Sequence, residues 1–305
     1  MSVFLPIAGL SINLFLLIGA GALIGFLSGL LGVGGGFLLT PILMSIGIAP
    51  TVAAASDSCQ IVAASSSGLA GHVRLGNVDF RMGGILLLGG LVGGSLGVEL
   101  IKVLRSLGNV DLAITITYVV MLGGTGSYML IESLRGLRRG SVVVPKRHRA
   151  PKKGTLLARL PFKMEFPRSH VEHSILVPFL FCVIIGILTS IMGVGGGFIL
   201  VPVMVYLLWM PPHVAIGTSL FQILFTCAWV TYMQAVTNQT VDLMLAVLLA
   251  AGSTVGAQVG VRVSRVMRGA QLMILLAVLA LGMMLKMAIG MVIAPRVLLS
   301  AVSGH

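Results

Sequence analysis

The sequence predicts an all-α polytopic membrane protein built from two inverted-topology repeats of five segments, with short or broken helices at glycine-rich motifs. Three observations predict this fold: an apolar composition, a duplicated glycine motif and an uneven distribution of basic residues. Hydrophobic residues make up 57% of the 305 residues, and charged residues only 9%. Because soluble domains carry about 25% charged residues, this chain belongs mainly in lipid.

The duplicated motif is the strongest internal signal. Residues 32–41 read GVGGGFLLTP and return at 193–202 as GVGGGFILVP. Further matches follow in the same order, among them Ser56 with Thr218 and Asp79 with Asp242. A register this steady predicts two copies of one unit. We therefore divide the chain into a first membrane repeat at 1–135, a basic linker at 136–173 and a second membrane repeat at 174–305.

Each copy contains five apolar segments. They span 12–31, 36–48, 51–73, 79–101 and 110–135 in the first copy, and 174–193, 197–210, 213–237, 241–262 and 270–293 in the second. The second segment of each copy is too short to cross about 30 Å of hydrocarbon untilted. Either every segment changes side, or the first two form a re-entrant hairpin. Both alternatives give an odd number of crossings, so the two copies have opposite orientations.

The basic residues support this topology. Ten of the 20 lysines and arginines lie between Gly136 and His173, and the positive-inside bias places such a segment in the cytoplasm. Arg74, Arg81 and the arginines of 262–268 then lie inside too, and both termini are periplasmic. A parallel repeat would export one basic cluster. The linker also suits contact with membrane lipids, whereas nucleic-acid binding is not expected.

The two glycine runs are the candidate substrate-binding site. Consecutive glycines can end one helix and begin the next while exposing their amides, and a helix N-terminus attracts anions. Two such ends that meet inside the membrane would cradle a small anionic substrate. The predicted binding glycines are Gly34, Gly35, Gly36, Gly195, Gly196 and Gly197.

Close helix packing is the alternative explanation for glycine in a membrane protein. We prefer it for the glycines that are spaced by four residues. These are Gly89, Gly93 and Gly97 in the first copy, and Gly252, Gly256 and Gly260 in the second.

Polar residues follow each glycine run at matching places. The hydroxyl and amide side chains can donate hydrogen bonds to an oxyanion, or they can bond to neighbouring helices. Asp57 is an acid near the start of the third segment. It is either a proton carrier that couples transport to the proton gradient or a helix N-cap near the outer interface. The other candidate binding residues are Ser56, Gln60, Thr218, Ser219 and Gln222.

Enzyme and ATPase signatures are missing from the membrane segments. The sequence has no His-Glu-x-x-His, Gly-x-Ser-x-Gly or Walker-type phosphate loop there, so we expect neither catalytic residues, nor a cofactor, nor a metal. The expected function is secondary transport of a small anion. The alternative is a transporter or channel for a different solute, such as a cation held by backbone carbonyls. Homo-oligomerisation is left open.

The paired GVGGGF-x-x-x-P segments, with Gly-Thr-Ser-Leu-Phe at 217–221 after the second, resemble the TauE/SafE family of sulfite and organosulfonate exporters. The resemblance covers roughly 12–135 and 174–293 and excludes the basic linker. It implies export of sulfite or an organosulfonate across the bacterial inner membrane. The first copy reads Ser-Asp-Ser at 56–58 where the second reads Thr-Ser-Leu, and this departure leaves the identity of the substrate open.

Overall fold

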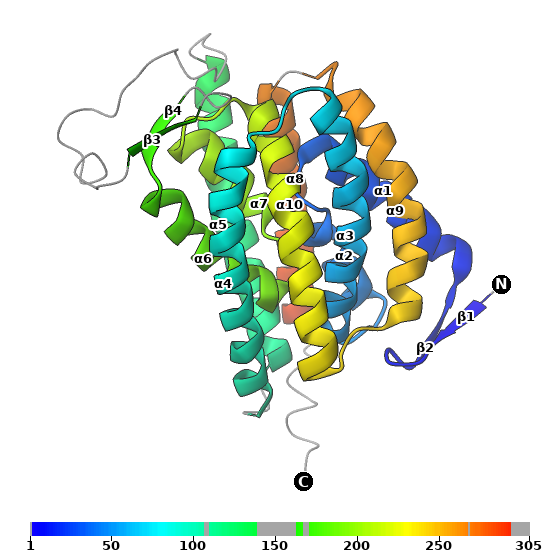
Figure 1. Ribbon diagram of the computed structural model, residues 1–305. Helices are drawn as coiled ribbons and strands as arrows, with labels where there is room; N and C mark the ends of the chain where they lie inside the picture. Colours follow the sequence, from blue (N-terminus) through cyan, green and yellow to red (C-terminus); the bar gives the residue numbers. More distant parts are fainter. Residues whose placement is uncertain (1, 107–109, 139–162, 167–170, 268, 294–305) are drawn as a thin grey trace.

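The computed structural model describes residues 2–106, 110–138, 163–166, 171–267 and 269–293, and each of the ten predicted segments contains a helix (Figure 1). The all-α prediction is therefore confirmed. The helices are α1 (Leu14–Leu31), α2 (Gly36–Ser45), α3 (Pro50–Arg74), α4 (Phe80–Ser106), α5 (Val110–Arg138), α6 (Leu176–Met192), α7 (Gly197–Pro202), α8 (Pro212–Met233), α9 (Leu243–Ser264) and α10 (Gly269–Ile293). Two π-helical turns extend α7 and α8, namely η2 (Val203–Leu207) and η3 (Gln234–Asn238).

The helices are those of a polytopic membrane protein. Within the described residues, six are long and apolar enough to cross a membrane: α1, α4, α5, α8 with η3, α9 and α10. Helix α3 has 25 residues but carries five serines and an aspartate. It tolerates this polarity because α1, α2, α8 and α9 pack around it and shield it from lipid.

Short antiparallel hairpins flank the helices. The first consists of β1 (Ser2–Leu5) and β2 (Leu10–Asn13), and the second of β3 (Lys163–Phe166) and β4 (Val171–Ser174). In the first hairpin, the backbone N–H groups of Ile7 and Ala8 donate to the Asp242 Oδ2 atom at 3.0 and 3.2 Å. This hairpin therefore covers the start of α9. Most of the predicted basic linker lies outside the described residues.

One end of the molecule is defined by contacts between residues far apart in sequence. At this end the Thr51 nitrogen donates to the Asp111 Oδ1 atom at 3.3 Å, which joins the starts of α3 and α5. The Arg105 Nη1 atom donates to the Asn238 carbonyl at 2.8 Å, which joins the ends of α4 and η3. We call it the Asp242 end, because Asp242 caps α9 there.

The opposite end is called the Asp79 end. There the Asp79 nitrogen, just before α4, donates to the Thr218 Oγ1 atom near the start of α8 at 3.0 Å. The start of α1 and the end of α2 both lie at the Asp242 end. A Cβ atom built on Gly47, just after α2, would lie 3.8 Å from the side chain of Leu10, just before α1. The first two segments therefore form a helical hairpin with both ends at the Asp242 end, as the re-entrant alternative predicts.

Glycines spaced by four residues let two pairs of helices pack in parallel. Those of α4 contact backbone carbonyls of α6, and those of α9 contact backbone carbonyls of α1. The contacts are Gly89 with Phe179, Gly93 with Val183 and Gly97 with Ile187, then Gly252 with Ile18, Gly256 with Ala22 and Gly260 with Phe26. The packing interpretation of these glycines is confirmed. Because α4 runs from the Asp79 end, α6 does too, whereas α1 starts at the Asp242 end.

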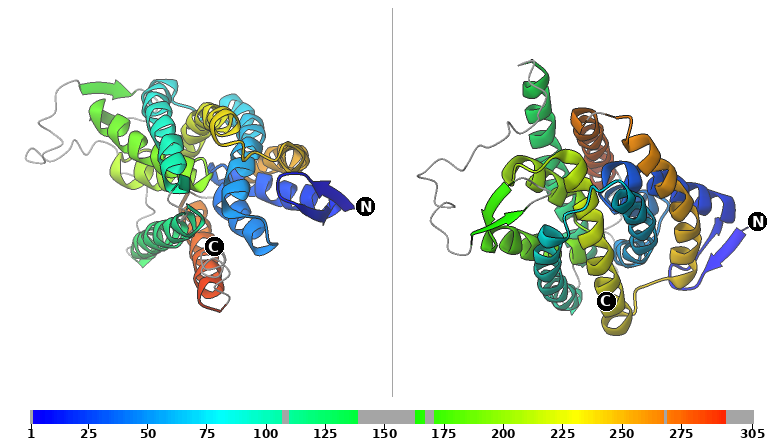
Figure 2. Two further views of the ribbon diagram at one scale, coloured as in Figure 1. Left: turned by 90° about the horizontal axis from the view of Figure 1, so that it is seen from below. Right: turned by 45° about the horizontal axis from the view of Figure 1, so that its top comes forward.

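The remaining long helices complete the assembly. Helices α3 and α8 pack on each other and against the two parallel pairs, and α5 lies beside α10 at one side of the molecule (Figure 2). The largest fully buried side chains include Tyr118, Phe37 and Phe198, which lie where the two copies meet. The centre of the protein is therefore the place where α2 and α7 begin.

Replacing Gly256 by leucine is expected to lower the thermal stability of the purified protein. A Cβ at this position would lie 2.8 Å from the Phe26 nitrogen, so α9 and α1 would have to separate. Overpacking of this kind costs about 1–3 kcal/mol. The measurement is the melting temperature in detergent. Gly84→Leu is the matched control, because nothing lies within 4 Å of the Cβ position of Gly84; equal melting temperatures for the two variants would contradict the packing role.

Candidate functional site

Both predicted glycine runs form sharp turns that break a helix. Glycine is required because successive residues adopt the left-handed region, with φ of 78° and 86° at Gly34 and Gly35, and 74° and 72° at Gly195 and Gly196. Other L-residues reach this region at a cost of roughly 1–2 kcal/mol each. The repeated sequence therefore folds into the same local structure twice.

The two turns meet at the centre of the molecule. A Cβ built on Gly36 would lie 2.9 Å from the Val194 Cα atom, and one built on Gly197 would lie 2.5 Å from the Val33 Cα atom. Just beyond the turns, the matching rings of Phe37 and Phe198 stack with centroids 6.0 Å apart and an interplanar angle of 25°. The structure thus brings the two turns, which contain all six predicted glycines, into contact through Gly36 and Gly197.

Backbone donors are concentrated at these turns. In the described part of the chain, no hydrogen bond is donated by the amides of Gly34, Gly35, Gly195 or Gly196. Helix α2 begins directly after the first turn, and the continuous helical run of residues 197–207 begins after the second. Buried amides are normally paired, so these groups are candidate hydrogen-bond donors to a bound substrate.

Apolar side chains enclose the turns in this conformation. The Cβ position of Gly34 lies 3.0 Å from Ile61 and 3.4 Å from Ile223, and that of Gly195 lies 2.9 Å from Ile223 and 3.1 Å from the Cys227 Sγ atom. An anion can therefore reach the space between the turns only after they separate. Such closely packed glycine turns can act as a gate as well as a cradle.

Asp57 lies beside the first turn and is fully buried. Its Oδ2 atom accepts a 2.7 Å hydrogen bond from the Thr40 hydroxyl and lies 2.8 Å from the Cβ position of Gly36. Its Oδ1 atom has no hydrogen-bond partner among the described residues. The alternative that Asp57 is a helix N-cap is wrong, because α3 begins at Pro50, about two turns earlier.

Two further residues of this cluster were not predicted. Thr40 holds the Asp57 carboxylate, and Tyr118 of α5 lies within electrostatic range of that carboxylate and of the Thr40 side chain. The Tyr118 hydroxyl donates to the Met192 carbonyl at 2.5 Å, at the last residue before the second turn. The sequence could have pointed to Thr40, because Thr40 is polar whereas the matching residue in the second copy is the apolar Val201.

The predicted hydroxyl residues bond to the protein backbone. The Ser56 Oγ atom accepts from the Asp242 nitrogen at 2.9 Å, and the Thr218 Oγ1 atom accepts from the Asp79 nitrogen at 3.0 Å. These matching contacts hold the starts of α9 and α4. The Ser219 hydroxyl donates to the Gly32 carbonyl at 2.6 Å, so of the three it is Ser219 that supports a glycine turn.

The two predicted glutamines are fully buried. The Gln222 Nε2 atom donates to the Thr226 hydroxyl at 2.8 Å and lies 2.5 Å from the Cβ position of Gly90 in α4. Gln222 therefore faces α4, whereas the next residue, Ile223, faces the turns. Neither amide atom of Gln60 has a hydrogen-bond partner among the described residues.

Metal-ligating groups are not clustered near the turns: the described residues contain no set of three histidine, cysteine, aspartate or glutamate side chains that could hold an ion. The ion pairs found in the same residues lie on exposed helix ends, at Lys102–Glu99 and Arg135–Glu132. Asp57 therefore has no basic partner in the described structure.

Comparison with known proteins places this architecture in a family. The model of the family described as "Sulfite exporter TauE/SafE" matches residues 17–287. A Bacillus subtilis (strain 168) protein named "Probable membrane transporter protein YunE" is 24% identical over 267 residues, covering 83% of this chain and 89% of the relative. A "Probable membrane transporter protein" of Xylella fastidiosa (strain 9a5c) is 27% identical over 250 residues, covering 81% and 84%.

A shorter match links the chain to a plant protein. "Sulfite exporter TauE/SafE family protein 1" of Arabidopsis thaliana is 34% identical over 100 residues, covering 32% of this chain and 22% of the relative. No solved structure gives a significant match. The family model spans both glycine turns and nearly every described helix. The chain therefore belongs to the sulfite exporter TauE/SafE family of membrane transporters.

Proposed function

We propose that this protein is a secondary transporter that exports a small sulfur-containing anion, sulfite or an organosulfonate, across the bacterial inner membrane. The observation that carries the proposal is the meeting of the two glycine turns, with buried amides that donate to nothing else in the described structure. Backbone amides at helix N-termini favour negative charge. The family description, sulfite exporter, supports the choice of a sulfur oxyanion.

The re-entrant hairpins supply the moving parts of the proposed mechanism. The turns of α1–α2 and α6–α7 are in contact and enter from opposite ends of the molecule. Relative movement of the two copies around this contact would open the centre to one end at a time. Inverted repeats with broken helices at the midplane work in this way in other secondary transporters.

The distribution of charge supports an orientation. Arg74, Arg81, Arg262 and Arg265 gather at the Asp79 end, at the ends of α3 and α9 and the start of α4. Cytoplasmic loops carry an excess of basic residues. We therefore assign the Asp79 end to the cytoplasm and the Asp242 end to the periplasm, so that export runs from the first to the second.

Asp57 is the proposed proton-coupling residue. The two other buried aspartates have capping roles, since Asp79 accepts from the Arg81 and Met82 nitrogens and Asp242 from the Leu245 nitrogen. Asp57 instead lies against the first turn and has no basic partner among the described residues. A lone carboxylate inside the membrane is costly as an anion and is often part of a proton relay.

Purified protein in liposomes is expected to move radiolabelled sulfite. The flux should saturate, continue when sodium is replaced by choline, and be inhibited by short alkyl sulfonates. It should also respond to an imposed pH gradient. Protein-free liposomes are the control for leakage of the neutral acid.

Two outcomes would contradict this function. One is a protein that moves no sulfite or sulfonate above the protein-free rate. The other is a flux that requires sodium and accepts cations instead of anions, which would favour the cation alternative.

A further inference from the structure

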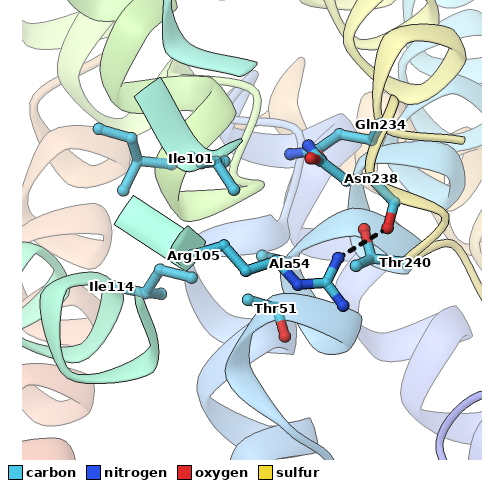
Figure 3. A pocket seen from close by; sticks show the side chains of 9 residues that line it. Thr51, Ala54, Ile101, Arg105, Ile114, Gln234, Asn238 and Thr240 are labelled. Carbon is cyan, nitrogen blue, oxygen red and sulfur yellow. Dashed lines mark hydrogen bonds between the residues drawn. The ribbon is translucent and has the colours of Figure 1, made fainter. Parts of the chain in front are cut away.

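A crevice opens into the molecule at the Asp242 end, between the two copies (Figure 3). The crevice is small: its volume is about 10 Å³, room for about one water molecule, so a larger guest would lie at its mouth. Its lining includes Thr51 and Ala54 of α3, Arg105 of α4, Ile191 of α6 and Asn238 of η3. The glycine-turn site described above does not include this crevice.

The inner wall of the crevice leads to the glycine turns. Ala54 lies one turn before Asp57 on α3, and its carbonyl contacts the Cβ position of Gly193. Ile191 lies directly before Met192, whose carbonyl accepts from the Tyr118 hydroxyl. The inner wall of the crevice therefore lies about one helical turn from the central cluster.

The Arg105 side chain extends across the crevice toward Asn238 (Figure 3). Its Nη1 atom donates to the Asn238 carbonyl at 2.8 Å. This carbonyl is available because it belongs to the last residue of the π-helical turn, after which Gln239 has a φ of 51°. A guanidinium has five N–H donors, and no other hydrogen bond of Arg105 is found among the described residues.

The charges around the crevice favour an anion. None of its lining residues is acidic. Asp111 of α5 lies behind Thr51, accepts from the Thr51 nitrogen at 3.3 Å and interacts electrostatically with Arg105. It offsets part of the positive charge without entering the crevice. The other polar lining consists of the hydroxyls of Thr51 and Thr240 and the amides of Gln234 and Asn238. The Asn238 amide donates to Gln234 and the Gln234 amide donates to the Ser190 carbonyl, so Arg105 carries the spare donors.

We propose that Arg105 is a second binding station for the transported anion, placed at the mouth of the crevice at the Asp242 end. The inference rests on the proposed function and names the residue that holds the anion at this end. Guanidinium N–H groups pair with the oxygens of a sulfur oxyanion in a fork geometry that an ammonium cannot match. Arg105 holds a small oxyanion at the mouth of the crevice after the anion has left the glycine turns.

The test measures sulfite exchange in proteoliposomes of one orientation, with sulfite presented at the Asp242 end. Arg105→Gln is expected to raise the KM for sulfite by about tenfold, in line with the loss of a charge-assisted hydrogen bond. Arg105→Lys should recover part of that loss. Asp111→Asn, which can still accept from Thr51, should lower the KM because it removes the opposing charge.

Lys102→Gln is the matched control. It removes one positive charge from the same end of α4, but Lys102 has a 63% exposed side chain and pairs with Glu99. Its KM should stay unchanged. Equilibrium binding of radiolabelled sulfite to the detergent-purified protein gives a second readout, and Arg105→Gln should weaken it.

Each outcome decides between definite alternatives. If Arg105→Gln lowers the melting temperature and the maximal rate but leaves KM and binding unchanged, Arg105 is only a structural latch between α4 and η3. If the wild-type protein transports sulfite and KM is the same in all variants, the Arg105 proposal alone fails. A wild-type protein that neither moves nor binds sulfite overturns the proposed function together with this inference.

Discussion

Gly197→Ala is expected to reduce anion transport by about tenfold or more, which corresponds to about 1.4 kcal/mol in the rate-limiting step. The φ of Gly197 lies outside the left-handed region, so alanine brings no torsional penalty. Its methyl group would instead lie 2.5 Å from the Val33 Cα atom and 2.6 Å from the Ile223 side chain. The two glycine turns would have to move apart, and the alignment of their amides would be lost.

Sulfite flux in proteoliposomes, normalised to the amount of folded protein, measures this effect. Gly84→Ala is the matched control, because its added methyl group meets nothing within 4 Å and alanine is a better helix former. We expect wild-type flux from the control. Wild-type flux from Gly197→Ala would show that contact between the turns is not part of the transport cycle.

Asp57→Asn is expected to abolish the response of sulfite transport to a pH gradient. Asparagine keeps the size of the side chain and an acceptor for the Thr40 hydroxyl, but it cannot take up a proton. When one proton is coupled to each sulfite, a gradient of one pH unit can maintain about a tenfold ratio of sulfite concentrations across the membrane. This ratio corresponds to about 1.4 kcal/mol. The variant should exchange sulfite across the membrane without this accumulation.

The measurement compares sulfite accumulation with and without an imposed pH gradient. Ser58→Ala is the control, because within the described residues the buried Ser58 hydroxyl donates to the Ala54 carbonyl of its own helix, at 3.1 Å, and not to Asp57. Accumulation that still follows the pH gradient in Asp57→Asn would exclude Asp57 as the proton carrier.

The local features of the fold were predictable from the sequence. Apolar segments bounded by glycine, proline and charged residues predicted the helices, because length and hydropathy are local properties. The consecutive glycines and the glycines spaced by four were correctly assigned to breaks and to packing, since a packing face needs one small residue per turn. The hairpin formed by β1 and β2 was missed, because its loop is held by Asp242, more than 230 residues away.

Only part of the candidate site could be predicted from the sequence. Repeat alignment found the turns and Asp57, but it cannot tell which face of α3 or α8 points to the centre. Ile61 and Ile223 face the turns, whereas the predicted Gln222 is rotated toward α4. Tyr118 and Arg105 belong to α5 and α4, and they reach the central cluster and the crevice through contacts that no sequence spacing encodes.

The two parallel helix pairs have a consequence for how the molecule is assembled. Each pair joins one copy to the other, with α1 against α9 and α6 against α4. A single copy on its own would expose both of the helix surfaces that contact the other copy. A chain severed between the copies is therefore expected to form a complete fold only when its two fragments associate through both helix pairs.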